Sequence, residues 1–220
     1  MELSSLNPEQ RQAVKTLDGP LLILAGAGTG KTRVITSRVA YMIAKDISPD
    51  SILAVTFTNK AAREMKERVR ELVPKFKSDS DGKIQKPTIC TFHSLCVSIL
   101  RRHIEKLGYK KNFVIYDQSE QLGVVRRLLS HISDKSKKPD PYVVLSVISR
   151  WRNNSADSLN SADADTAALA KHLIKTYKQT LKASNAVDFD DLILLVLQLF
   201  NEHPLALQEC RDRYRYIMVD

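Results

Sequence analysis

Three of the chain's 7 glycines fall within five residues, and this cluster constrains the fold more than any other feature of the sequence. Gly26, Gly28 and Gly30 are followed directly by Lys31 and Thr32. A glycine-rich loop that ends in Gly-Lys-Thr lets backbone N–H groups surround phosphate oxygens, while the lysine reaches the outer phosphates and the threonine hydroxyl binds Mg²⁺. The sequence therefore predicts a phosphate-binding loop.

The segments on both sides of the glycine loop have the patterns that such a loop requires. Residues 21–25 form a short apolar run, typical of a strand buried on both faces, and apolar residues recur at helical spacing over residues 31–45. The helix would direct the positive end of its dipole at the phosphates. Ala25 stands where a first glycine is usual. The alternative interpretation is a flexible glycine turn between a strand and a helix.

Apolar strands and helices continue to alternate beyond the loop. Strands are predicted over residues 52–56 and 88–91. Helices are predicted over residues 59–72, with Thr58 as the N-cap, and over residues 92–107. This order is typical of an α/β fold with a parallel sheet and helices on both of its faces.

The pattern changes at Gly108, where the strands stop. Helices are predicted over residues 117–132, 142–152 and 165–183, with no central strand between them. This stretch is therefore interpreted as an all-helical insertion in the α/β domain. Two more helices, over residues 187–200 and 205–214, lead to a last apolar run, residues 216–219.

Asp220 follows that last apolar run directly. In proteins with a phosphate-binding loop, a carboxylate at the end of a second strand completes the magnesium shell. On its own, an aspartate after a strand more often begins a loop. Together with the glycine loop, it predicts that Thr32 and Asp220 hold one Mg²⁺.

The charge of the chain favours a polyanionic partner. Lys and Arg number 34 against 25 Asp and Glu, which gives a net charge of +9. Residues 101–152 hold 12 basic and 5 acidic side chains, and residues 60–87 hold 9 and 5. Nucleic acid is the polyanion that such patches commonly bind. An ordinary solvated basic surface explains the composition equally well.

Other features exclude several classes of protein. No apolar run is long enough to cross a membrane, and the first residues have no signal-peptide pattern. Three cysteines are too few for a disulfide framework, which fits a reducing compartment. The sequence therefore predicts a cytoplasmic protein without a membrane anchor.

Several segments, in order along the whole chain, resemble the superfamily 1 DNA helicases of the UvrD/Rep/PcrA type. They are residues 6–10 (LNPEQ), 25–32 (AGAGTGKT), 56–65 (TFTNKAAREM), 91–94 (TFHS), 187–192 (VDFDDL) and 217–220 (IMVD). That family also has alanine at the first position of the loop. The resemblance implies a P-loop NTPase of the RecA-like type, interrupted by a helical subdomain.

The resemblance implies roles for individual residues. Gln10 would contact the adenine edge, and Lys31 and Asp220 would be catalytic. The residues implied in nucleotide binding are Gln10, Ala25, Gly26, Ala27, Gly28, Thr29, Gly30, Lys31, Thr32 and Arg33. Those implied in binding single-stranded DNA are Thr56, Phe57, Asn59, Lys60, Thr91 and His93. From residue type alone, Phe57 would be a core aromatic and His93 a residue at a helix start.

The resemblance also implies the function of the chain as the N-terminal part of an ATP-dependent 3′–5′ DNA helicase. Residues 1–107 and 187–220 would form its first motor domain, and residues 108–186 the insertion. Its cofactors would be ATP and Mg²⁺, and its partners single-stranded DNA and junctions of single- and double-stranded DNA. The water-activating base and the arginines that stabilise the transferred phosphate are expected outside these 220 residues. We therefore expect weak nucleotide binding and very slow hydrolysis from this chain alone.

Two other functions remain open on the sequence. One is a nucleotide- and DNA-binding module without catalysis, and the other is the helicase part of a RecB-like helicase-nuclease. A zinc site at Cys90, His93 and Cys96 is not expected, because a second pair of ligands is missing. The acidic residues 188–191 are interpreted as the capped start of a helix, and Trp151 as a core residue.

Overall fold

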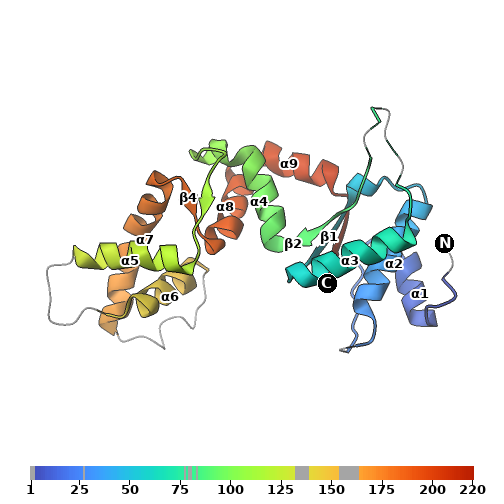
Figure 1. Cartoon of the computed structure of the whole chain (residues 1–220), viewed down its shortest axis with the longest axis horizontal. Helices are drawn as coiled ribbons and strands as arrows, with labels where there is room; N and C mark the ends of the chain where they lie inside the picture. Colours follow the sequence, from blue (N-terminus) through green and yellow to red (C-terminus); the bar gives the residue numbers. More distant parts are fainter. Residues whose placement is uncertain are drawn as a thin grey trace. The chain divides into compact units, whose positions relative to one another are not determined.

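The computed structural model describes residues 3–26, 28–76, 78, 81–82, 84–131, 139–153 and 164–220 (Figure 1). The chain forms two compact units. The sheet unit is Met1–Leu95 with Leu205–Asp220, and the helical unit is Cys96–Pro204. The division from sequence has its boundaries at 107/108 and 186/187 instead. In the structure, helix α4 (Phe92–His103) from Cys96 onward and all of helix α8 (Phe189–Glu202) therefore belong to the helical unit.

The sheet unit is built on three parallel strands in the order β2-β1-β5. Besides α4, its elements are α1 (Pro8–Lys15), α2 (Lys31–Ala44), the 3-10 turn η1 (Pro49–Ser51), β1 (Ile52–Thr56), α3 (Asn59–Leu72), β2 (Thr88–Thr91), α9 (Pro204–Arg213) and β5 (Tyr216–Val219). Thr56 lies opposite Thr91 in the register, and Val55 opposite Val219. The predicted α/β fold with a parallel sheet is confirmed.

The central strand β1 is buried along its whole length, which explains its continuous apolar sequence. Ile52 and Ala54 pack in one cluster with side chains of α2 and α3, among them Met42 and Met65. Helix α3 lies along β1 and β2 and also packs against α2 (Figure 1). Both faces of β1 are therefore covered, because residues on its other face, such as Val55, are buried as well.

The prediction of a buried strand over residues 21–25 is wrong. These residues form no strand, and Leu22 and Leu24 are 80% and 86% exposed. A β-strand needs a neighbour to satisfy its backbone groups. None of the three strands of the described sheet pairs with this segment. Within the described residues only Ile23 of this segment packs against a core cluster, that of Leu6, Val14 and Val34, and β-propensity alone does not bury the rest.

The helical unit has a core formed mainly by α5, α6 and α7 (Figure 1). Its elements after α4 are the 3-10 turn η2 (Ile104–Leu107), β3 (Val114–Ile115), α5 (Gln118–Ser130), α6 (Pro141–Arg152), α7 (Ala164–Ala183), β4 (Ala186–Val187) and α8. Tyr177 is completely buried in this core, and Trp151 packs against its edge. The sequence analysis missed the short parallel ladder of β3 and β4, because two-residue strands have no detectable periodicity.

The acidic residues before α8 do form the capped start of a helix, as predicted. Asp188 is the N-cap, and its carboxylate accepts a hydrogen bond from the backbone N–H of Asp191 at 2.7 Å. Both carboxylates also bind the guanidinium of Arg152, with 2.6 Å between Arg152 Nη1 and Asp188 Oδ2. The Tyr177 hydroxyl donates to Asp188 at 3.0 Å. This buried cluster joins α6, α7 and α8.

The described residues contain neither a helix that could span a membrane nor a cluster of metal-ligating side chains. None of the helices there has the length and apolar character needed to cross a membrane. In the same ranges, no three His, Cys, Asp or Glu side chains are grouped so that they could hold a metal ion.

Candidate nucleotide and nucleic-acid site

The candidate site lies at the carboxyl edge of the parallel sheet. Because β1, β2 and β5 run in the same direction, Phe57, Thr91 and Asp220 follow or end their strands at the same edge. The backbone N–H of Asp220 donates to the Val55 carbonyl at 2.9 Å, which extends the β5 pairing by one residue. Open parallel sheets bind their ligands at this edge.

The glycine loop leads directly into α2. Gly28 and Gly30 have φ angles of 76° and 89°, in the left-handed region that glycine adopts without strain. Gly30 is the N-cap of α2, and no side chain caps this helix. The first N–H groups of α2 are therefore oriented toward the loop without a capping side chain, which is the arrangement that binds anions.

Lys31 lies over the loop with its ammonium group against the loop's own backbone. Its Nζ donates to the carbonyls of Ala25 at 3.0 Å and Gly26 at 2.7 Å. Thr29 Oγ1 also donates to the Gly26 carbonyl, at 2.7 Å. All three bonds are exposed. A phosphate can therefore replace the carbonyls as the partner of this ammonium group with little change in the loop. Ala27 lies outside the described residues.

Thr32 and Asp220 are brought together from opposite ends of the chain. The Thr32 hydroxyl donates to Asp220 Oδ2 at 3.1 Å and is 3.5 Å from Oδ1. A hydroxyl and a carboxylate oxygen, both exposed, are the hard ligands that Mg²⁺ takes in proteins while keeping several waters. The donor set therefore fits a magnesium ion held between the helix start and the end of β5.

Gln10 connects the loop to a helix that the sequence analysis missed. Its Oε1 accepts from the backbone N–H of Asn7 at 3.2 Å, which closes a capping box at the start of α1. Its Nε2 donates to the Thr29 carbonyl at 3.0 Å. Helix α1 is short and strongly polar, but Asn7 before Pro8, with Gln10 three residues after the cap, is a sequence signal for its start.

Replacing Gln10 by alanine is expected to destabilise the sheet unit by about 1–2 kcal/mol, because two hydrogen bonds of its amide are lost. The measurement is thermal unfolding followed by circular dichroism. Gln12→Ala is the matched control, since Gln12 lies on the exposed side of the same helix. Equal stability of the two variants would contradict a linking role for Gln10.

A cavity of about 480 Å³ opens beside the glycine loop. Its walls combine apolar and charged side chains, and among its lining residues are Leu6, Gly30, Arg33, Arg68 and Leu72. The Arg33 side chain is exposed at this position, one residue after Thr32. A cavity of this size and mixed polarity is suited to a nucleoside.

The residues predicted to bind DNA differ in their accessibility. Phe57 is 85% exposed, and Asn59 and Lys60 are exposed beside it at the start of α3. Thr56 and Thr91 are buried, at 3% and 6% exposure. An exposed phenylalanine at the edge of a sheet has no packing role within the described residues.

The Thr91 hydroxyl is used within the fold. It accepts from the backbone N–H of Ser94 at 3.2 Å and shares a 2.9 Å hydrogen bond with the Ser94 hydroxyl. It therefore caps the start of α4. His93 is half-buried in the first turn of the same helix.

Residues 6–220 match the family described as UvrD/REP helicase N-terminal domain. The chain belongs to this family. The match covers both units, so the helical unit is part of the UvrD/REP domain and not a foreign addition. The glycine loop, the Thr32–Asp220 pair and the exposed Phe57 all lie within the matched residues.

Curated relatives of this UvrD/REP domain are much longer proteins. The ATP-dependent DNA helicase PcrA of Staphylococcus aureus (strain Mu50) is 42% identical over 222 residues, which are 99% of this chain and 30% of the relative. The protein of the same name from Bacillus subtilis (strain 168) is 43% identical, over 99% of this chain and 29% of the relative. The chain thus spans about 30% of the length of these relatives.

Proposed function

We propose that this chain is the ATP-binding part of an ATP-dependent DNA helicase that moves 3′ to 5′ along single-stranded DNA in the cytoplasm and opens duplexes at their junctions. The observation that carries the proposal is the Thr32–Asp220 contact beside the glycine loop, at the same sheet edge as the exposed Phe57. This arrangement supports a nucleotide site and a DNA site on one sheet. The relatives are named ATP-dependent DNA helicases, which supports the ATP and DNA parts of the proposal.

In the nucleotide site, each part of MgATP has a matching group. Gln10 and Arg33 would contact the base or its sugar beside the 480 Å³ cavity. The backbone of residues 25–30 and the start of α2 would hold the phosphates, with Lys31 on the outer ones. Thr32 and Asp220 would hold Mg²⁺, which neutralises charge on the phosphates when bound. We assign catalysis to Lys31 and Asp220 together with groups outside these 220 residues.

In the DNA site, the exposed side chains would make the contacts. The ring of Phe57 would stack on a base, and Asn59 and Lys60 would bind the phosphate next to it. Because Thr56 and Thr91 are buried, we propose that they do not contact DNA themselves but position Phe57 and His93 at the ends of the two strands. Residues 1–107 and 187–220 would act as the motor part, and residues 108–186 as its insertion.

The function is tested by binding measurements on this chain with MgATP, with oligo-dT and with both together. We expect nucleotide binding that depends on Mg²⁺ and a change of nucleotide affinity when DNA is bound, since both ligands contact the same sheet edge. The proposal would be refuted if the chain failed to bind MgATP or failed to bind oligo-dT. Rapid DNA-stimulated hydrolysis by this chain alone would refute the assignment of essential catalytic groups to residues outside it.

Replacing Phe57 by alanine is expected to weaken oligo-dT binding by about 5- to 100-fold, because base stacking on an aromatic side chain contributes about 1–3 kcal/mol. Fluorescence anisotropy of labelled oligo-dT measures the change. The control is Tyr142→Ala, which removes an aromatic side chain of 53% exposure from the helical unit. If both variants bind oligo-dT as the parent chain does, Phe57 is not a DNA contact.

A further inference from the structure

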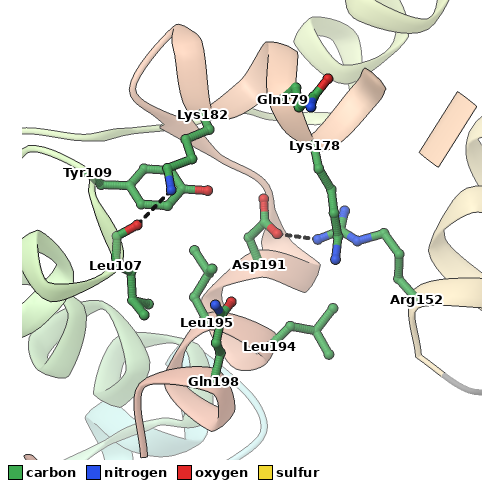
Figure 2. Close-up of a pocket in the computed structure, with 10 residues that line it drawn as sticks. All are labelled: Leu107, Tyr109, Arg152, Lys178, Gln179, Lys182, Asp191, Leu194, Leu195 and Gln198. Atoms are coloured by element: carbon green, nitrogen blue, oxygen red, sulfur yellow. Dashed lines mark hydrogen bonds and ion pairs between the residues drawn. The ribbon is translucent and has the colours of Figure 1, made fainter. Parts of the chain in front are cut away.

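A second cavity, of about 370 Å³, lies in the helical unit and has no part in the function proposed above (Figure 2). It is formed by the segment after η2 and by helices α6, α7 and α8. The lining residues that matter here are Tyr109, Lys178, Gln179, Lys182, Leu194 and Gln198. Figure 2 shows Tyr109 and Lys178 on opposite sides of the cavity, with the leucine side chains of α8 below them. Small-molecule sites occupy cavities of about 300–1,000 Å³.

The wall of the cavity beside Tyr109 is fixed by internal contacts. Lys182 Nζ donates to the Leu107 carbonyl at 2.8 Å and lies 5.3 Å from the centroid of the Tyr109 ring. A side chain at Gly108 would come within 3.2 Å of the same Nζ atom, and Gly108 has a φ of 76°. The ring and the ammonium group are therefore held in place without a ligand.

On the opposite side, the cavity wall contains the buried Arg152 cluster. The Arg152 side chain is 1% exposed, and its charge is shared by Asp188 and Asp191. Its Nε is buried and has no hydrogen-bond partner among the described residues. Arg152 carries one positive charge against two carboxylates, and its contact with Asp191 reduces, without cancelling, the repulsion that this carboxylate exerts on an anion in the cavity.

Lys178 supplies an exposed cation at the cavity, close enough to Asp191 to lower the pKa of that carboxyl group. It is exposed and makes no hydrogen bond or ion pair with the described residues. It lies four residues before Lys182 and three after Lys175 on α7, a spacing at which like charges repel one another. Like charges at this spacing cost stability in the free protein, and a bound anion relieves the repulsion.

We propose that this cavity binds a nucleoside phosphate. Lys178 and Lys182 would face the phosphate, the flat ring of Tyr109 would stack on the base, and the amides of Gln179 and Gln198 would pair with donors and acceptors on the base edge. The apolar floor, including Leu194, suits the sugar and the base. The ligand is either a free nucleotide or one nucleotide of a DNA strand that follows the exposed lysines of α7, including Lys175.

The probe for the free nucleotide is dTMP, titrated into the full chain carrying Lys31→Ala and followed by calorimetry. Lys31→Ala weakens nucleotide binding at the glycine loop. The titration therefore reports on the cavity of the helical unit whether or not the proposed site at the glycine loop binds nucleotide. Lys178→Gln is expected to weaken dTMP binding about tenfold, because one charge-assisted hydrogen bond is lost. Lys175→Gln is the matched control, since it removes the same charge from the same helix outside the cavity.

A second variant tests the cavity without changing its charge. Leu194→Trp fills the space next to the half-buried Leu194, and it is expected to abolish dTMP binding while thermal unfolding stays cooperative. If the helical unit of this variant does not fold, Lys178→Gln alone decides the question. No dTMP binding by the Lys31→Ala chain, or equal losses in Lys178→Gln and Lys175→Gln, would overturn the proposal.

The two sources of the ligand are separated by a short oligo-dT in the same background, with Phe57→Ala added to remove the sheet-edge contact. If the cavity holds one nucleotide of a strand, Lys175→Gln weakens oligo-dT binding but leaves dTMP binding unchanged. If the ligand is a free nucleotide, dTMP binds at least as tightly as the oligonucleotide and Lys175→Gln affects neither.

Discussion

Replacing Lys31 by alanine is expected to lower the affinity of the chain for MgATP by about 10- to 100-fold, since hydrogen bonds to charged groups contribute about 1.5–3 kcal/mol each. Among the described residues, the ammonium group donates to two exposed carbonyls, of Ala25 and Gly26, which water can solvate when the side chain is removed. Stability should therefore change little. The measurement is calorimetric titration with a non-hydrolysable ATP analogue and Mg²⁺.

Lys15→Ala is the control for this experiment. It removes an exposed lysine from the last turn of α1 and leaves the loop unchanged. Both variants should melt at the temperature of the parent chain, while only Lys31→Ala loses affinity. Unchanged nucleotide affinity in Lys31→Ala would show that the glycine loop is a structural turn, which is the alternative that the sequence leaves open.

Replacing Arg152 by methionine is expected to destabilise the helical unit by about 3–5 kcal/mol, because it leaves two buried carboxylates without their cation. The side chains of Asp188 and Asp191 that face Arg152 are 2% and 7% exposed, so water cannot take its place. Methionine retains most of the volume of the arginine stem, which confines the change to charge and hydrogen bonding. Urea unfolding monitored by circular dichroism measures the loss.

The pH dependence of this loss distinguishes an electrostatic cause from a packing defect. Burial, and then the charge of Asp188, raise the pKa of Asp191 from 3.8 to about 6. Between these values the folded state binds more protons than the unfolded chain. Because of this group, the free energy of unfolding of the protein therefore falls as the pH rises toward 6. Arg152 lowers this pKa, so its removal raises the pKa further, and the stability deficit of Arg152→Met should shrink as the pH falls toward 6.

Arg126→Met is the matched control for the buried cluster, since Arg126 is exposed on α5 of the same unit. It should change the stability by less than about 0.5 kcal/mol at any pH in this range. A loss in Arg152→Met that is independent of pH would mean that lost packing, and not the buried carboxylates, causes the instability.

The elements best predicted from sequence are those whose local pattern and tertiary environment agree. β1, α3 and β2 have the predicted bounds, because β1 is apolar up to Val55 and Thr58 caps α3 by accepting a hydrogen bond from the backbone N–H of Ala61. The carboxylate of Asp220 and the hydroxyl of Thr32 also lie within hydrogen-bond distance of each other. For these three elements, residues close in sequence determine the structure.

The predictions that failed depend on distant partners. Residues 21–25 have a strand pattern, but a pattern cannot supply the neighbouring strand that would bury them. The link from Gln10 to Thr29 and the cluster of Arg152 with the two aspartates join residues that are 19 to 39 positions apart. No periodicity or spacing indicates such pairs, because only the packed fold brings them together.

The order of synthesis on the ribosome gives the contact between Thr32 and Asp220 a kinetic consequence. These residues are 188 positions apart, and the helical unit emerges from the ribosome between β2 and β5. Until β5 is made, the described sheet has only β1 and β2, and two paired strands are marginally stable alone. Contacts this far apart in sequence form slowly, because a long loop must close first. Asp220 is therefore synthesised after the whole helical unit, so a nascent chain cannot bring Thr32 and Asp220 together before that unit has been made.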